Sequence, residues 1–448
     1  MIIKNREELI SSSLYARAVE LIEAGIRRVL PAKLMRAAVK YSAAKNQLMV
    51  SGVKYNLSKG RVFVIGGGKA SGLMAEELER TTGPGTISAG IVNCKTGGYK
   101  TEKVAIIEAG HPVPDEAGVR GVREMLAMKA RYNIGKGDLV ICLISGGGSS
   151  LLPCPVAGVI LEDKQDMTQL LLRCGADIKE INTVRKHLSL IKGGGLAGFY
   201  EPARVVSLVI SDVVGDDLDA IASGPTVADP TTFADALKVL KKYRLLGKAP
   251  QNAVGFINRG CEGAEAETPK NLSNCDNYLI GNNRMALEAI AEKARDLGLK
   301  PSILTSEMAG DTASLARRTA EDMVKGKYRG FDVVLLGGET TPALPENAGK
   351  GGRNQHYAAV SMLAMQDLAR PWVVASVGSD GSDYLPDVAG AMVDNRSLDL
   401  ARAAGLDVED YIERFDSNTL FTKMGRSLIV TGPTGTNVSD IVLYLPGC

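Results

Sequence analysis

The sequence predicts an α/β protein made of two domains. Short apolar runs alternate with stretches of helical periodicity along all 448 residues. Most runs are continuous, as in parallel sheets whose two faces are covered by helices. Glycine-rich loops follow many of them, at the strand ends where parallel sheets bind ligands. The length also exceeds what one hydrophobic core usually supports.

The polar segment 246–275 is expected to separate the domains. It is rich in charged residues, glycine and proline, which is typical of a linker. We therefore expect an N-terminal domain over 1–250 and a C-terminal domain over 275–448. Expected strands are 61–65, 87–92, 103–108, 138–144 and 204–211 in the first domain, and 277–281, 301–305, 331–336, 371–377, 426–431 and 441–445 in the second. Expected helices include 116–131, 284–297, 311–326 and an N-terminal helix for which Asn5 and Glu8 form a capping pair.

Composition excludes several classes of protein. The net charge is +2 and only one tryptophan is present, so a nucleic-acid-binding surface is not expected. No apolar run reaches the length of a membrane span, and charged residues interrupt the N-terminus, unlike a signal peptide. Seven scattered cysteines form no C-x-x-C pair. This argues against a disulfide framework or a zinc site and favours a cytoplasmic location.

The first glycine-rich loop follows the first expected strand. Its Gly66, Gly67 and Gly68 let backbone N–H groups approach a ligand closely, and Lys69 adds a positive charge before a helical pattern begins. The loop matches neither a P-loop nor a dinucleotide-binding fingerprint, because Ser71 stands where the third glycine of the fingerprint belongs. It predicts a phosphate or carboxylate site. The alternative is a tight turn between strand and helix.

A second loop follows the expected strand 138–144 and places three glycines between three serines. Its N–H and hydroxyl groups suit several phosphate oxygens. A serine nucleophile is the alternative, but the G-x-S-x-G pattern is missing. The loop comprises Ser145, Gly146, Gly147, Gly148, Ser149 and Ser150.

Basic residues precede a third glycine-rich stretch. Arg185, Lys186 and Lys192 fall within one or two helical turns of one another, and Gly193 follows Lys192. Lys192 and Gly193 are therefore candidates for binding phosphate together with the second loop. The alternative for the basic residues is a solvated face of a helix.

Acidic residues and one arginine complete the candidate site. Asp212 follows the expected strand 204–211, where a carboxylate binds Mg²⁺ or accepts a proton from a hydroxyl. Arg353 lies in a glycine-rich segment just before a helix, and arginine holds carboxylates and phosphates through two parallel hydrogen bonds. Asp380 belongs to an acidic loop that is either a metal site or a set of Asx turns.

Motifs along nearly the whole chain resemble, in the same order, those of the glycerate 2-kinase family whose C-terminal region is called MOFRL. The segment 383–387 departs from the usual pattern of that family. The matching motifs are GGGKAS at 66–71, AGHPVPDE at 109–116, SGGGSSLL at 145–152, INTVRKHLS at 181–189, KGGGLA at 192–197, SDVVGDDLDAIASGPT at 211–226, GGETT at 337–341, GGRNQ at 351–355, GSDGSD at 378–383 and TGPTGTNVSD at 431–440.

The resemblance implies ATP-dependent phosphorylation of D-glycerate at its 2-hydroxyl, with ATP and Mg²⁺ as expected cofactors. It also implies a Rossmann-like parallel-sheet N-terminal domain, a smaller mixed-sheet C-terminal domain and a site in the cleft between them. The functional lysine, aspartate and arginine of the family fall on Lys69, Asp212 and Arg353. Ser71 and Asn354 are further candidates for contacting glycerate. Asp212 and Asp380 are the candidate metal ligands, and a homodimer is compatible with the sequence.

Two other functions fit parts of the sequence. The first is an NAD(P)H-dependent hydroxypyruvate reductase, a name given to some members of the family. No G-x-G-x-x-G followed by an acidic residue at the expected distance supports it. The second is a non-catalytic sensor of sugar acids or nucleotides, which the lack of a DNA-binding or signalling segment disfavours.

Overall fold

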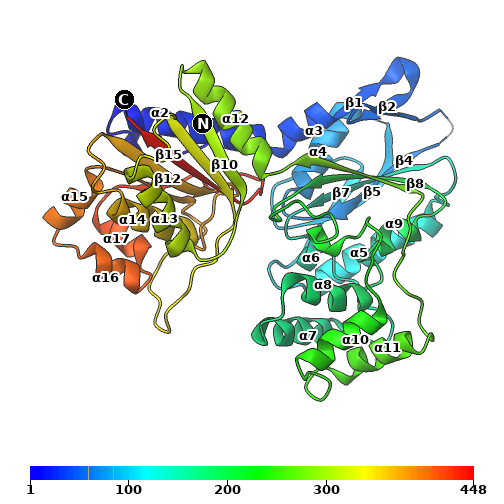
Figure 1. Cartoon of the computed structure of the whole chain (residues 1–448). Helices are drawn as coiled ribbons and strands as arrows, with labels where there is room; N and C mark the ends of the chain where they lie inside the picture. Colours follow the sequence, from blue (N-terminus) through cyan, green and yellow to red (C-terminus); the bar gives the residue numbers. More distant parts are fainter. Residues whose placement is uncertain (59, 84, 448) are drawn as a thin grey trace. The chain divides into compact units, whose positions relative to one another are not determined.

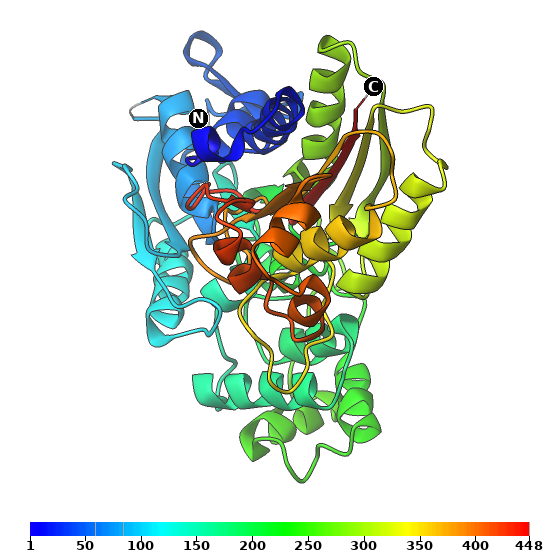
Figure 2. The same ribbon diagram turned by 90° about the vertical axis from the view of Figure 1, so that its left-hand side faces the viewer.

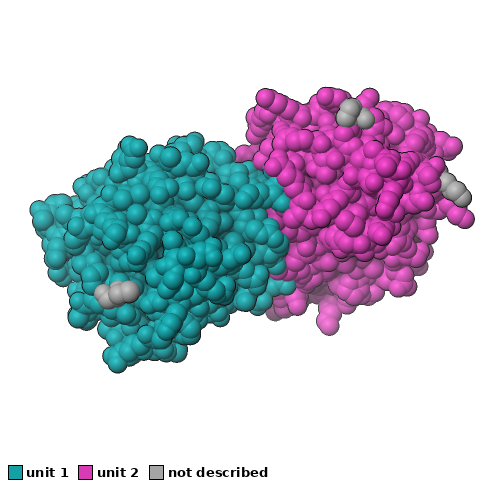
Figure 3. Space-filling view, turned by 90° about the horizontal axis from the view of Figure 1, so that it is seen from above, with its two compact units in different colours: residues 1–33, 212–215, 281–448 teal, residues 34–211, 216–280 magenta. Residues whose placement is uncertain are grey.

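The chain divides into two compact units in the computed structural model, which describes residues 1–58, 60–83 and 85–447. Unit 1 comprises 1–33, 212–215 and 281–448, and unit 2 comprises 34–211 and 216–280 (Figure 3). These bounds differ from the predicted domains of 1–250 and 275–448. The difference arises because the N-terminal segment 1–33 and the four residues 212–215 pack with the C-terminal part of the chain.

Unit 2 contains a six-stranded sheet in the order β6-β5-β4-β7-β8-β9. Counted along the chain within this sheet, the order is 3-2-1-4-5-6, that of a Rossmann-like doubly wound fold. Strands β4 to β8 are parallel, and the strand order reverses between β4 and β7. The strands are β4 (Val62–Gly67), β5 (Ile87–Cys94), β6 (Val104–Glu108), β7 (Leu139–Ser145), β8 (Arg204–Ile210) and β9 (Cys275–Gly281).

Helices α4 (Ser71–Thr82) and α5 (Glu116–Arg131) cover opposite faces of this sheet. A Cβ on Gly72 of α4 would lie 2.8 Å from Cys94 Sγ, and a Cβ on Gly121 of α5 would lie 2.0 Å from Asn93 Oδ1. Successive residues of a strand point to opposite faces, so Asn93 and Cys94 identify the two sides. The doubly wound prediction for this part of the chain is confirmed.

Four further helices of unit 2 pack around their own hydrophobic cluster, and Figure 1 shows them grouped together. The predicted linker 246–275 was wrong, because 251–261 within it form a helix whose apolar side chains, including Phe256 and Ile257, are buried in this cluster. The four helices are α7 (Leu161–Arg173), α8 (Ile178–His187), α10 (Phe233–Lys242) and α11 (Gln251–Cys261). Short helices are α6 (Gly148–Leu151), α9 (Gly195–Phe199) and the 3-10 turns η1 (Ala43–Lys45) and η2 (Ile221–Ser223).

Unit 2 also carries a small antiparallel sheet that the sequence did not reveal. It is formed by β1 (Val39–Ser42), β2 (Gln47–Val50) and β3 (Val53–Asn56). The expected strand 277–281 belongs to unit 2 as part of β9, not to the C-terminal domain.

Unit 1 contains a mixed six-stranded sheet in the order β10-β11-β15-β12-β13-β14. Its last strand lies in the middle and runs antiparallel to both neighbours, β11 and β12. The strands are β10 (Pro301–Met308), β11 (Val333–Gly338), β12 (Trp372–Gly378), β13 (Gly390–Asp394), β14 (Leu428–Ile429) and β15 (Asp440–Pro446). The expected strand 426–431 is therefore much shorter than predicted, and β13 was missed.

Helices cover both faces of the unit 1 sheet. Helices α2 (Ser13–Arg28) and α12 (Asn283–Asp296) lie side by side against it (Figure 1, Figure 2), and α14 (Arg353–Ala364), with α13 (Thr312–Val324) beside it, packs on the sheet as well. The remaining helices of unit 1 are α1 (Arg6–Leu9), α15 (Ser397–Ala403), α16 (Val408–Glu413) and α17 (Ser417–Lys423), and α3 (Pro31–Ala38) runs from the last residues of the first segment of unit 1 into unit 2.

The N-terminal helix begins later than its predicted cap. Ser12 caps α2, its Oγ accepting a hydrogen bond of 3.3 Å from the N–H of Tyr15. The side chain of Asn5 instead donates to Leu428 O at 2.8 Å and accepts from Val430 N at 3.0 Å, so it ties the chain start to the C-terminal sheet.

The structure also bears on membrane-spanning helices and on disulfides. None of the helices in the described part of the chain combines the length and the apolar character needed to cross a membrane. The six cysteines of this part are all free thiols, and Cys448 lies outside the described residues.

Candidate functional site

The first two glycine-rich loops meet at the point where the strand order of unit 2 reverses. β4 and β7 are parallel neighbours, so the loops that follow them lie at the same edge of the sheet. The N–H of Lys69 donates to Gly146 O at 2.8 Å, and the N–H of Ala70 donates to Ser145 Oγ at 2.9 Å. Ligands bind at this position in doubly wound sheets.

Close contact between the loops requires glycine at position 68. Gly68 has a φ of 149°, and a Cβ there would lie 2.2 Å from Ser145 Oγ. Ser71 is fully buried, donates to Leu143 O at 3.0 Å and shares a hydrogen bond of 3.2 Å with Ser145 Oγ. Its hydroxyl therefore joins the two loops, and the predicted contact of Ser71 with substrate is not supported by this geometry.

The side chains of Lys69 and His111 both lie close to Gly147. A Cβ on Gly147 would be 3.1 Å from Lys69 Cγ and 2.9 Å from His111 Cδ2. His111 lies within one of the matching motifs, but the sequence did not single it out. The structure places it beside the predicted catalytic lysine.

A third segment joins the second loop through Lys192. The Lys192 side chain is buried and its Nζ donates to Ser149 O at 3.2 Å and to Ala222 O at 3.1 Å. The hydroxyls of Ser149 and Ser223 share a hydrogen bond of 2.9 Å, and Ser223 Oγ donates to Asn182 Oδ1 at 3.0 Å. The predicted phosphate-binding residues Ser149 and Lys192 are thus neighbours.

The turn η2 within this network has an unusual backbone. Ala222 and Ser223 have φ values of 53° and 60°, in the left-handed region that residues other than glycine rarely adopt. The N–H of Gly193 donates to Ser223 O at 3.0 Å, which helps hold the turn. Strain of this kind persists only where surrounding contacts fix it, and it is common at functional sites.

Arg353 begins α14 in unit 1 and is surrounded by carboxylates. Its Nε and Nη2 donate to the two oxygens of Asp440 at 2.6 and 3.1 Å, and its Nη1 donates to Glu339 Oε1 at 2.7 Å. Burial alone would lower the pKa of Arg353, but the carboxylates of Asp440 and Glu339 outweigh it and raise the pKa. One side of the guanidinium is therefore already occupied by Asp440.

Asn354 and Gln355 continue this network around Asp383. The carboxylate of Asp383 accepts from the N–H of Asn354 at 2.9 Å and from the N–H of Gln355 at 2.8 Å, so it caps α14. Burial raises the pKa of Asp383 to about 6, against the effect of these hydrogen bonds. The buried Asn354 side chain also donates to Asp440 Oδ1 at 2.9 Å, so it is a buried hydrogen-bonding partner of the acidic residues.

The two predicted metal ligands both attach to the segment 431–440 of unit 1. Asp212 Oδ2 accepts from Asn437 Nδ2 at 2.8 Å. Asp380 Oδ1 accepts from the N–H and Oγ of Ser382, each at 3.0 Å, and its backbone O accepts from Thr434 N. Asp380 therefore makes the Asx turn that was the alternative to a metal site. Over the described ranges, no group of three or more His, Cys, Asp or Glu could hold a metal ion.

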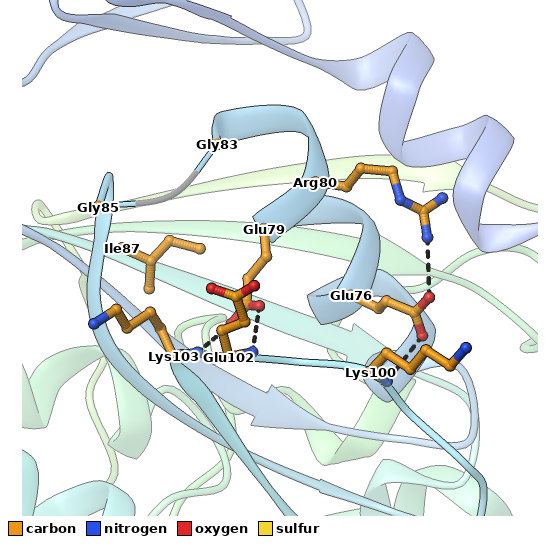
Figure 4. Close-up of a pocket in the computed structure, with 9 residues that line it drawn as sticks. All are labelled: Glu76, Glu79, Arg80, Gly83, Gly85, Ile87, Lys100, Glu102 and Lys103. Carbon is orange, nitrogen blue, oxygen red and sulfur yellow. Dashed lines mark hydrogen bonds and ion pairs between the residues drawn. The ribbon is translucent and has the colours of Figure 1, made fainter.

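Two cavities differ in their relation to these residues. One of 340 Å³ lies beside Arg353 and is also lined by Leu344, Tyr384 and Phe415. The other, of 320 Å³, is formed by α4 and by the segments before β5 and β6 (Figure 4). It thus lies at the amino ends of the parallel strands, opposite to the glycine loops.

Two glutamates of the second cavity have internal partners. Glu79 accepts hydrogen bonds from the backbone N–H groups of Glu102 and Lys103 at 2.6 and 2.8 Å, and Glu76 pairs with Arg80 at 3.0 Å (Figure 4). These contacts hold the chain entering β6.

Several residues of the candidate site were not predicted as such. Asp440 starts β15, and its position opposite Gly338 and Gly378 follows from an antiparallel pairing that the sequence does not reveal. The segments that contain these residues were noted as motifs, which was the available signal. The residues are His111, Asn182, Ser223, Glu339, Asp383 and Asp440.

Comparison with known proteins gives consistent matches over both units. A family model described as "Domain of unknown function (DUF4147)" matches residues 17–258, and the model of the MOFRL family matches 332–440. A protein of Pyrococcus horikoshii named glycerate 2-kinase is 40% identical, over 96% of this chain and 98% of its own. A protein of Agrobacterium vitis with the provisional name hydroxypyruvate reductase is 39% identical, over 94% of each chain.

A solved structure supports the same relationship. The crystal structure of glycerate kinase from Thermotoga maritima matches with a TM-score of 0.83 and 36% identity, over 96% of this chain and 99% of its own. Sequence identity of this degree over nearly the full length of both proteins is well above what a shared fold alone requires. The chain belongs to the glycerate 2-kinase family.

Proposed function

We propose that the protein transfers the γ-phosphoryl group of ATP to the 2-hydroxyl of D-glycerate in the presence of Mg²⁺. The observation that carries this proposal is the meeting of two glycine-rich loops, one of them with Lys69, at the strand-order reversal of unit 2 in a chain of this family. Phosphoryl transfer requires mainly positioning and neutralisation of charge, which these loops are suited to provide.

Lys69 is the group that stabilises charge on the phosphoryl group during transfer. Its side chain extends past Gly147 of the second loop, whose N–H and hydroxyl groups are candidates for binding phosphate oxygens. A fixed cation in this position interacts more strongly with the transition state than with the ground state, because negative charge is redistributed as the bond breaks.

Arg353 is the anchor for the carboxylate of glycerate. Asp440 occupies the Nε and Nη2 side of the guanidinium, so the substrate binds on the Nη1 side, where the half-exposed Glu339 makes way. Asp440 then fixes the orientation of the guanidinium group of Arg353. Asp212 accepts the proton of the attacking hydroxyl, in an orientation held by Asn437.

Mg²⁺ supplies charge neutralisation for the phosphates of the nucleotide. It needs only one or two protein carboxylates because phosphates and water complete its coordination. Binding the metal is the alternative to the role of Asp212 as proton acceptor, and Asp212 is our first choice for such a ligand. Asp380 is the second choice, since its side chain already serves a turn. The described carboxylates thus fit a nucleotide-bound metal better than a metal held by the protein alone.

The anchoring of the carboxylate also favours the 2-position as phosphoryl acceptor. The 2-hydroxyl is one carbon from the anchored carboxylate, whereas the 3-hydroxyl is two carbons away and has more rotational freedom. Restricting the acceptor in this way lowers the entropic part of the barrier.

The test is to incubate the protein with ATP, Mg²⁺ and D-glycerate and to couple the product to enolase, with and without phosphoglycerate mutase. Enolase acts on 2-phosphoglycerate directly, so the expected signal does not need the mutase. A signal only with mutase means that the 3-phosphate is formed. NADH or NADPH oxidation with hydroxypyruvate, in the absence of ATP turnover, would favour the reductase instead.

A further inference from the structure

Three cationic side chains of unit 2 lie around the end of α8, and none of the described residues provides them with an acidic partner. Lys192 is only 2% exposed, and Arg185 and Lys164 are half-buried. The alternative of a solvated basic helix face is therefore wrong for this segment. Cations removed from water are unfavourable unless an opposite charge accompanies them.

Two hydrogen bonds and the helix face of Arg185 place the three cations in the same region of unit 2. Asn182 and Arg185 are three residues apart on α8, so they share a helix face, and Asn182 contacts Ser223 next to Ser149. Lys164 Nζ donates to Leu188 O, just after α8, at 2.9 Å. Lys192 Nζ donates to the backbone O of Ser149, as described above.

The acidic residues of the neighbourhood are paired with other cations. Lys186 forms ion pairs with Asp219 and Asp229, and Glu267 contacts His187 at 3.1 Å. Within the described part of the chain, the ammonium groups of Lys164 and Lys192 donate to neutral carbonyl groups and to no carboxylate. Among the residues that the structure describes, no carboxylate neutralises the three cations.

The electrostatic effects of the three groups on one another agree with this geometry. Burial lowers the pKa of Lys192 well below its ordinary value, and Arg185 and Lys164 lower it further. Burial, followed by Arg185, lowers the pKa of Lys164 to about 7. Arg185 thus makes both lysines less stable in their charged form, and Lys164 does the same to Lys192. A bound anion would reverse this effect.

We propose that Lys164, Arg185 and Lys192 bind the polyphosphate chain of the nucleotide, next to Ser149 of the second glycine loop. The inference rests on the proposed kinase function and adds Lys164 and Arg185 to its site. Glycerate carries one negative charge, whereas a nucleoside triphosphate carries several. Three uncompensated cations therefore fit the nucleotide better than the substrate carboxylate.

The most direct test is Arg185→Gln, because Arg185 has no ion-pair partner in the described part of the chain and its loss should leave the fold intact. Calorimetric titration with ADP and with inorganic tripolyphosphate should show affinity weaker by about 10-fold or more for both. The KM for glycerate should stay within about two-fold. The exposed Arg173 on α7 is the matched control, and Arg173→Gln should bind both probes normally.

A second pair of variants keeps the test independent of folding. Arg185→Lys retains the charge and should recover most of the affinity, and Lys164→Gln should weaken both probes, with Lys238→Gln on α10 as its exposed control. The alternative role of Lys164 is to stabilise the C-terminal end of α8, where it donates to Leu188 O. In that case Lys164→Gln would lower the stability of the protein but leave its affinity for the two probes unchanged.

The outcomes separate this inference from the proposed function. If the protein phosphorylates glycerate but Arg185→Gln and Lys164→Gln bind tripolyphosphate as well as the parent does, the inference is overturned and the kinase proposal stands. If no phosphoglycerate forms yet tripolyphosphate binding depends on Arg185, the anion site stands and the kinase proposal fails. If the two variants raise only the KM for glycerate and bind both probes normally, the cations belong to the substrate site and the inference is overturned.

Discussion

Among single residues, Arg353 shows how neighbouring carboxylates determine which N–H groups of an arginine remain available to a ligand. Its position before a helix in glycine-rich backbone predicts an anion-binding arginine, but the structure gives it Asp440 and Glu339 as partners. An arginine held by one carboxylate presents its remaining N–H groups in a fixed direction. This arrangement suits recognition of a second carboxylate, provided that Glu339 moves aside.

Arg353→Lys should raise the KM for glycerate much more than the KM for ATP. Lysine keeps the charge but cannot donate to Asp440 and to a substrate in one plane. We expect an increase of about 10-fold or more in the glycerate KM, measured by initial rates with each substrate varied in turn. A change confined to the KM for ATP would place Arg353 at the nucleotide and contradict the proposed role.

Lys69→Ala should lower kcat while the protein remains folded. The loss of one charge that stabilises a transition state typically costs about 100-fold or more in rate, and the loop hydrogen bond of Lys69 uses its backbone rather than its side chain. Lys136, exposed before β7, is the matched control, and Lys136→Ala should keep full activity. A folded Lys69→Ala variant with near-normal kcat would falsify the catalytic role.

His356 is a buried histidine whose effect depends on pH. It lies in the first turn of α14, its ring is 4.4 Å from that of Phe415, and Nδ1 has no hydrogen-bond partner in the described chain. Burial lowers the pKa of His356 from 6.5 to about 4, although Asp311 acts in the opposite direction. His356 therefore stays neutral in the folded protein under conditions where the unfolded chain takes up a proton.

The sign of the pH effect follows from this difference. Below the unfolded pKa the unfolded state binds more protons, so the free energy of unfolding falls as the pH falls towards the folded pKa. Between about pH 7 and about pH 5 the loss is about 2 kcal/mol. His356→Phe removes the titrating group, so its unfolding free energy should fall by about 2 kcal/mol less over the same range.

The single tryptophan allows this to be measured in the relevant unit. Trp372 is buried in the core of unit 1, as is His356, so urea unfolding followed by its fluorescence reports on that unit. Equal pH dependence of the two proteins would show that folding leaves the pKa of His356 unchanged, against the expected low pKa.

Close approach of backbone segments is the main feature at the scale of elements. The second glycine loop leads into α6, and Gly148 faces η2 so closely that a Cβ would lie 2.7 Å from the Cβ of Ala222. The left-handed backbone of Ala222 and Ser223 is held by this packing and by the hydrogen bonds of Lys192 and Gly193. Neither the loop nor the turn is expected to hold its shape without the other.

Gly148→Ala should therefore disturb both segments. Overpacking of a buried position costs about 1–3 kcal/mol, and displacement of η2 moves Ser223 and Lys192 away from Ser149. We expect a lower melting temperature and a raised KM for ATP. Gly98→Ala is the control, since a Cβ there meets nothing within 4 Å. Equal melting temperatures and ATP kinetics for both variants would contradict the proposed coupling.

At the scale of the whole molecule, two different sheets present their candidate residues at strand ends. In unit 2 the strands are parallel and the loops after β4 and β7 lie at one edge. In unit 1 the antiparallel β15 brings the start of one strand to the same edge as the ends of β11 and β12, so Asp440 lies between Gly338 and Gly378. The two units thus supply cations and carboxylates by different topological routes.

Activity of the whole protein should require a divalent cation but no zinc. Exhaustive EDTA treatment followed by assay in metal-free buffer should abolish phosphorylation, and Mg²⁺ should restore it, because phosphates and a few carboxylates form a site for hard cations. Apo-protein melting temperatures should be unaffected by EDTA, since the described residues form no metal cage of their own. Full activity after the treatment would sink this prediction.

The amino-acid sequence was sufficient to predict the α/β class, the glycine loops and the family. These depend on local patterns: continuous apolar runs, loop glycines and motif order. It did not determine that residues 1–33 pack with the C-terminal unit, that 251–261 form a buried helix, or that Asn5 bonds to 428–430. Such features depend on contacts between distant residues, which short patterns do not encode.

The candidate site divides in the same way. Lys69, Ser149 and Lys192 were found because glycine loops at strand ends have a recognisable local signature. The partners Asp440, Ser223 and Asn182 were missed because their roles arise from strand pairing, a left-handed turn and the face of a helix. The burial of Lys192 and the half-burial of Arg185 and Lys164, with no acidic partner among the described residues, became known from the structure, because burial and neighbouring charge are properties of the packed chain.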